Sequence, residues 1–161
     1  MQNIASMRSY GPAALRLCVG AVFLVHGAQK LFGLLGGAGI AGTAKQLTSL
    51  GLPYPTPLAV TLGITEFGGG VLLILGSATM WVSLLLLLDM GLRVWKIHYP
   101  HGFTVTGGLT PGSGHLGELH LVMIGALICL MLGGPGIASL DERRSQNAEA
   151  QARGRARIRK V

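Results

Sequence analysis

The chain has 161 residues, of which 50% are hydrophobic and only 12% are charged, and its formal net charge is +7. Soluble domains typically carry about 25% charged residues, so this composition disfavours an ordinary soluble protein. No aromatic residue alternates with the basic residues of the C-terminal tail, which disfavours a stacking surface for nucleic acid.

Four apolar segments are long enough to cross about 30 Å of hydrocarbon. In chain order they lie at about residues 13–35, 58–76, 78–98 and 116–134. The loop after the first segment is glycine-rich, should contain a short interfacial helix near 43–50, and ends in prolines. About three residues join the second and third segments, which predicts a helical hairpin. We therefore predict an all-α fold, with an integral membrane four-helix bundle over residues 1–140.

The tail at residues 141–161 holds seven Arg or Lys side chains against three acids. We expect this basic segment to be disordered or bound to an anionic lipid surface. Flanks rich in Lys and Arg stay in the cytoplasm, so both termini should lie on the cytoplasmic side. The predicted location is the bacterial inner (plasma) membrane, with several spans and the lipid bilayer as the first partner.

Polar side chains from all four segments should lie at one depth. At about 1.5 Å per residue they fall in the extracytoplasmic half of the predicted spans. An ionised group there costs about 2.5–3.5 kcal/mol on insertion scales, so Lys30 and Arg93 should neutralise Glu66, Asp89 and Glu118. The histidines at the edge of such a pocket could titrate near neutral pH. The candidates for proton or anion handling are His26, Lys30, Glu66, Asp89, Arg93, Glu118 and His120.

Spacing also predicts which way these groups face. Asp89 and Arg93 are four residues apart and share one helical stripe. Glu66 shares a face with Ala59 and Gly70, and small-residue faces are where membrane helices meet. By the same argument Glu118 should point inward with its small neighbours on the last segment. Exchanging the charges of Glu66 and Lys30 together should then restore what either change alone removes.

Structural interpretations compete with these functional ones. Lysine and arginine side chains can simply reach the headgroups, and buried ion pairs can hold helices together without chemistry. Cys18 and Cys129 sit at a similar predicted depth, so a redox dithiol is conceivable. Buried cysteines are more often inert small hydrophobes. The five histidines lack the spacing of a metal site, and we predict none.

Four segments follow one another in an order that matches a known pattern. They are "LRLCVGAVFLVHGAQKLFG", "LGLPYPTPLAVTLGITEFGGGVLLILG", "IHYPHGF" and "GELHLVMIGALICLMLGGPGIASLD", which together span about residues 15–141. The sequence resembles the DoxX family of small bacterial membrane proteins. Asp89 and Arg93 have no clear match in the family pattern, so their role rests on spacing alone. The matching positions are Arg16, His26, Gly27, Lys30, Pro53, Glu66, Gly69, Glu118 and Asp141.

The resemblance implies a four-helix integral membrane protein. Members of the family are linked with thiosulfate and quinone oxidation, and with defence against catechols, quinones and oxidative stress. Distant eukaryotic relatives resemble chaperones or cargo receptors. The resemblance therefore favours an accessory subunit of a quinone- or sulfur-linked redox or detoxification pathway, with redox proteins as partners and a quinone as a candidate ligand.

Two other functions stay open at this point. The first is a non-catalytic membrane scaffold or chaperone for partner proteins. The second is proton-coupled export of a small molecule, although four short spans are few for alternating access. The chain carries no flavin, haem or iron–sulfur motif. Whether it catalyses a reaction itself is therefore left open, and electrons would need a quinone or a partner protein.

Overall fold

The computed structural model describes residues 2–98 and 116–158, and every helix boundary below refers to that part of the chain. It contains six α-helices and no strand within those residues, which confirms the all-α prediction. A π-helical turn, Val94–His98, continues α4. The loop between the third and fourth predicted segments, at residues 99–115, lies outside the described residues. The α-helices are α1 (Gln2–Phe32), α2 (Gly39–Ser49), α3 (Pro55–Leu75), α4 (Thr79–Arg93), α5 (Leu116–Gly133) and α6 (Leu140–Ile158).

The four predicted spans each correspond to a helix, α1, α3, α4 and α5. The stretches Tyr10–Phe32 and Pro55–Leu75 are long and apolar enough to cross a membrane, whereas Leu119–Gly133 is a shorter apolar helix. The third predicted span is divided at Arg93, where the α-helix gives way to the π-helical turn. Two helices are thus long and apolar enough to cross a membrane, and a four-span topology stays a prediction.

Glycines bring α1 and α3 into backbone contact. A Cβ on Gly27 would lie 2.5 Å from the Cα of Phe67, and one on Gly70 would lie 2.5 Å from the backbone nitrogen of Leu24. Gly20 and Gly63 continue this seam with equally tight contacts to Ile74 and Leu31 side chains. Small residues allow such close approach between helices in a bilayer. The glycine excess of the sequence is therefore used at a helix–helix interface.

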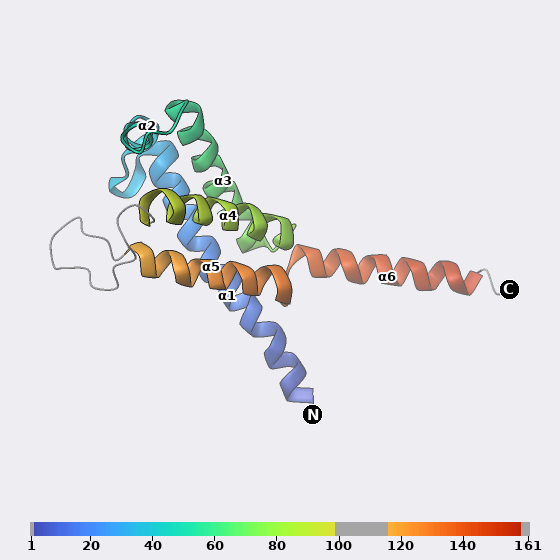
Figure 1. Cartoon of the computed structure of the whole chain (residues 1–161). Coiled ribbons are helices and arrows are strands. Elements are labelled where there is room, and N and C mark those ends of the chain that lie inside the picture. Colours follow the sequence, from blue (N-terminus) through green and yellow to red (C-terminus); the bar gives the residue numbers. More distant parts are fainter. Residues whose placement is uncertain (1, 99–115, 159–161) are drawn as a thin grey trace.

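One hydrophobic core joins α1, α3, α4 and α5. Its fully buried members come from all four helices, namely Phe23, Leu73, Leu86, Leu127 and Leu130. Figure 1 shows α4 and α5 running side by side and crossing α1 and α3, while α2 lies at the far end of α1 and α3. The short helix predicted near residues 43–50 is α2, and it packs on α3 through Ala44, Leu47 and Ala59.

Segments far apart in the sequence meet where α5 ends and α6 begins. The Arg16 guanidinium of α1 is buried and donates to the carbonyl of Pro135 at 3.1 Å. The Asp141 carboxylate accepts hydrogen bonds from the backbone N–H groups of Ala78 and Thr79, both at 2.8 Å. The backbone N–H of Asp141 donates to Gly76 at 3.0 Å. We call these contacts, made by Arg16, Gly76, Thr79, Pro135 and Asp141, the clasp.

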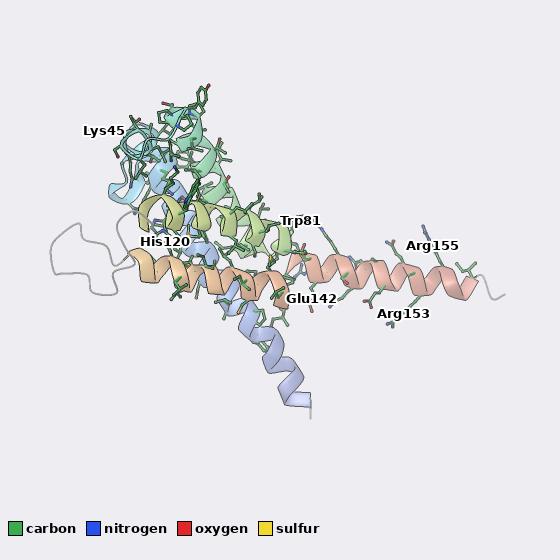
Figure 2. The ribbon with its side chains drawn as sticks, viewed as in Figure 1. Lys45, Trp81, His120, Glu142, Arg153 and Arg155 are labelled. Carbon is green, nitrogen blue, oxygen red and sulfur yellow. The ribbon has the colours of Figure 1, made fainter. Side chains whose placement is uncertain are left out.

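The tail, which was expected to be disordered or bound to a lipid surface, forms a helix over Leu140–Ile158. Helix α6 extends away from the other helices in Figure 1, and Figure 2 shows Arg153 and Arg155 projecting from it. The Ser139 hydroxyl accepts from the backbone N–H of Glu142 at 3.0 Å and caps its first turn. Acidic residues in that turn suit the helix dipole, and Ala, Gln, Glu and Arg favour helix along its length. Local propensity and capping therefore explain the difference.

Candidate functional site

Four charged side chains from three helices form one ion-pair network. The Lys30 ammonium on α1 lies 2.5 Å from both carboxylate oxygens of Glu66 on α3. The Arg93 guanidinium on α4 also pairs with Glu66, and with Asp89 one turn earlier at 3.1 Å. Glu66 and Asp89 are buried, whereas Lys30 and Arg93 keep side-chain exposures of 17% and 22%. The network thus has buried carboxylates and a partly open cationic side.

The glycine seam places Glu66 against Lys30. Ala59, Gly63, Glu66 and Gly70 lie on one buried stripe of α3, as the spacing predicts for three of them. Gly27 contacts the backbone at Phe67, one residue after Glu66. Lys30 follows Gly27 by three residues and so lies nearly one turn along the same side of α1. Close backbone contact therefore fixes the distance between the two charged groups.

Charge balance limits what the network can hold. Two cations face two carboxylates, so the group is formally neutral when all four are ionised. Breaking a buried pair leaves an uncompensated charge, whereas the satisfied set is tolerated in an apolar setting. The predicted pairing of Lys30 and Arg93 with Glu66 and Asp89 is present. The side chain of Glu118, the third predicted carboxylate, lies outside the described residues.

A pocket adjoins this network between α1, α2, α3, α4 and α5. It holds about 710 Å³ of empty space, including the space at its open mouth. Its polar lining residues are His26, Gln46, Glu66, Arg93 and His120. Its apolar lining residues are Val22, Phe23, Met90, Leu119 and Met123. An apolar pocket with a few convergent polar groups is the usual form of a small-molecule site.

The structure brings together six of the seven predicted candidates. The pocket is lined by His26, Glu66, Arg93 and His120. Lys30 and Asp89 belong to the ion-pair network that adjoins it. The small residues with which Glu118 was expected to share an inward face, Gly125 and Cys129, are exposed, and the buried stripe of α5 contains His120, Met123, Leu127 and Leu130. The small residues of α5 therefore did not predict which face of this helix is buried.

The two cysteines lie apart from this site. Cys18 and Cys129 are both free and exposed. Their small neighbours Ala14, Ala21 and Gly125 are exposed as well, so these small-residue faces are not packing surfaces within one chain. A redox role for the thiols stays a prediction. Among the residues that the structure describes, no group of His, Cys, Asp and Glu is arranged to hold a metal ion.

Sequence reasoning missed Gln46 and the function of Arg16. Gln46 lies on α2, which packs on α3 and places the amide at the pocket. A glutamine on a short polar helix gives no sequence indication of this, because only the path of the chain brings it there. Arg16 matches the family pattern, yet it belongs to the clasp at the opposite end from Lys30. The residues that match the family pattern therefore lie partly at the pocket and partly in the clasp.

Comparison with known proteins identifies the family. DoxX matches residues 11–99, more than half of the chain. An uncharacterized membrane protein of Mycobacterium tuberculosis is 35% identical over 142 residues, covering 84% of this chain and 82% of that protein. The inner membrane protein YphA of Escherichia coli is 28% identical over 129 residues, covering 80% and 86%. An uncharacterized protein of Haemophilus influenzae is 26% identical over 147 residues, covering 89% and 97%. No solved structure matches the chain. The chain belongs to the DoxX family of membrane proteins.

Proposed function

We propose that this DoxX protein resides in the inner membrane with four spans over residues 1–140 and both termini in the cytoplasm. The clasp supports this topology, since it joins α1 to the start of α6 at one end of the core while the ion-pair network lies at the other. The arginines of α6 favour the cytoplasmic side. Reporters fused to either terminus should stay cytoplasmic, and periplasmic labelling of one terminus would contradict the topology.

We infer that the pocket between the ion-pair network and Met123 binds the head group of a quinone. The observation that carries this proposal is the mixed lining, in which aliphatic and aromatic side chains accompany His26, His120 and Arg93. A quinone ring is apolar on its faces and accepts hydrogen bonds at its carbonyl oxygens. Histidine and arginine N–H groups are suitable donors to those oxygens.

Charge balance favours a neutral ligand over an anion such as thiosulfate. Lys30 and Arg93 already pair with carboxylates, and an anion in this pocket would also face Glu66. A like charge beside a buried carboxylate is unfavourable in a low-dielectric site. Within the quinone- or sulfur-linked alternatives, the geometry therefore supports the quinone.

The protein then acts as an accessory subunit of a redox or detoxification pathway. Reducing a quinone to a quinol takes two electrons and two protons. A redox partner protein supplies the electrons, and His26 and His120 at the pocket are placed to pass the protons. The chain's own contribution is to bind and orient the ring beside groups that exchange protons.

Equilibrium binding of a short-chain quinone to the purified protein in neutral-lipid nanodiscs tests this function. Met123→Trp fills the apolar side of the pocket and should weaken binding at least tenfold. Cys129→Ala changes an exposed position on the same helix and should bind like the wild type. Thermal unfolding of each variant checks that it is folded. A wild type without saturable binding, or a Met123→Trp variant with unchanged affinity, would refute the proposal.

One observation favours the scaffold alternative, because the four charged groups satisfy one another without a ligand. In that case the network only holds α1, α3 and α4 together. The Lys30→Met/Glu66→Gln double variant should then still co-purify with its partner proteins from mild detergent. Under the quinone proposal the wild type binds quinone whether or not partner proteins remain attached.

A further inference from the structure

A second pocket lies on the other side of the ion-pair network, between α2, α3 and α4. It holds about 470 Å³ of empty space, including the space at its open mouth. Its apolar lining is formed by leucines, namely Leu47, Leu50, Leu52, Leu62 and Leu92. Arg93 and Gln46 line both pockets.

Cationic groups dominate the polar part of this second pocket. Lys30, Arg93 and Lys96 line it, with Asp89 as its one carboxylate. Lys30 and Arg93 also neutralise Glu66, so the five charged groups sum to +1. None of the carboxylates whose side chains the structure describes pairs with Lys96, and its ammonium instead lies 4.6 Å from the ring centre of Trp95. The extra positive charge therefore resides at Lys96.

The neighbourhood of Lys96 is that of a membrane interface. Trp95 is 57% exposed, and tryptophan and lysine at a helix end typically lie at headgroup level. A ligand entering here from the bilayer would bring an aliphatic chain and a polar head together. The leucine walls match such a chain, and the net charge matches a single negative head.

We propose that this pocket is a second binding site, for a single-chain amphiphile with a carboxylate head. The carboxylate pairs with Lys96 and accepts a hydrogen bond from the Gln46 amide, and the alkyl chain lies among Leu47, Leu50 and Leu62. Its cationic partner and its apolar lining differ from those of the first pocket, since Lys96 and the leucines do not line that pocket. Its occupant would be a fatty-acid anion drawn from the surrounding bilayer.

Trp95 provides a direct reporter of this site. The chain has two tryptophans, so Trp81→Phe leaves Trp95 alone, and Figure 2 shows that Trp81 lies far from Lys45 and the α2 end. Dodecanoate titrated into this variant in neutral-lipid nanodiscs should give a saturable change in Trp95 fluorescence as Lys96 moves from the ring to the carboxylate. Dodecanol has the same chain without the charge and should bind at least tenfold more weakly.

Matched variants separate the site from general membrane charge. Lys96→Met should weaken dodecanoate binding about tenfold, whereas Lys45→Met removes an exposed charge from α2 outside the pocket and should leave it unchanged. Leu50→Phe narrows the pocket at constant charge and should also weaken binding. Equal binding of dodecanol and dodecanoate, equal effects of the two lysine variants, or no saturable response would overturn the proposal. None of these outcomes depends on whether a quinone binds.

Discussion

At the scale of single residues, Glu66 is the most constrained group in the protein. Its carboxylate is fully buried and faces both Lys30 and Arg93. The cost of burying one negative charge is offset by two cations from different helices. Glu66 is therefore both the centre of the network and the carboxylate nearest the first pocket.

Glu66→Gln should destabilise the protein by about 3–5 kcal/mol, because it leaves two cations facing the single charge of Asp89. The Lys30→Met/Glu66→Gln double variant retains the Arg93–Asp89 pair with no net charge and should recover most of the loss. Thermal unfolding in detergent measures both. A double variant less stable than Glu66→Gln would contradict the pairing.

Exchanging the charges of Lys30 and Glu66 is a poorer test than the sequence suggests. Glu66→Lys would face Arg93 directly, since that guanidinium pairs with the same carboxylate. The third member of the network lies on α4, and only the fold reveals it. Removing both charges avoids the new repulsion.

At the scale of helices, contact between α1 and α3 depends on positions where no side chain fits. Gly27 and Gly70 allow the two backbones to meet, and the meeting point lies beside the ion-pair network. Gly68 of α3 has a different environment, because a Cβ there would meet no atom within 4 Å. Gly68 is therefore a control position for the glycines at the contact between α1 and α3.

Gly27→Ala should destabilise the protein by about 1–3 kcal/mol, since the new methyl group overlaps the backbone at Phe67. Gly68→Ala adds the same methyl group in open space and should be neutral or slightly stabilising, because alanine favours helix. Unfolding temperatures of the two variants give the comparison. Equal losses at both positions would show that close packing at Gly27 is not the cause.

The clasp gives the start of α4 a cap from a distant residue. Burial of the Asp141 carboxylate opposes its charge, but hydrogen bonds from the N–H groups of Thr79 and Ala78 outweigh burial and hold its pKa below the ordinary value. A lowered pKa means that the folded state favours the ionised form. The stabilisation is therefore complete above the unfolded pKa of about 3.9 and is lost as the pH falls through the folded pKa.

Asp141→Asn should lower the stability at pH 7 by about 1 kcal/mol, because the amide nitrogen cannot accept one of the two backbone hydrogen bonds. The difference from the wild type should shrink as the pH falls below about 4, because the wild type then loses the same charge. Unfolding at pH 7 and pH 3 measures this. Glu149→Gln, which changes only an exposed pair with Arg153, is the control and should show no such pH dependence. A constant difference at both pH values would contradict a charged cap.

At the scale of the whole molecule, periodicity and apolar length predicted the helices, while tertiary contacts determined the site. The apolar segments predicted α1, α3, α4 and α5, because a long apolar stretch is typical of a membrane-spanning helix. The Asp89–Arg93 stripe and the buried face of Glu66 followed from helical spacing. Gln46 was missed because its position depends on how α2 packs on α3, which no local pattern encodes.

The tail and α5 show where local arguments failed in different ways. Net charge suggested a disordered tail, yet propensity and the Ser139 cap support a helix. On α5 the small residues that indicated an inward face are exposed, and the core instead takes Met123, Leu127 and Leu130. Composition alone therefore predicts neither the helix in the tail nor the buried face of α5. The division of motif residues between a pocket end and a clasp end became visible only in the fold.

The central claim is that the pocket beside Glu66 holds a quinone in the native membrane. The most direct measurement is mass spectrometry of small molecules extracted from wild-type and Met123→Trp protein, each isolated in nanodiscs cut from the cell membrane. We expect quinone to be enriched with the wild type relative to the bulk lipid extract, and to fall to the bulk ratio in Met123→Trp. Quinone at the bulk ratio in the wild-type sample would contradict the claim.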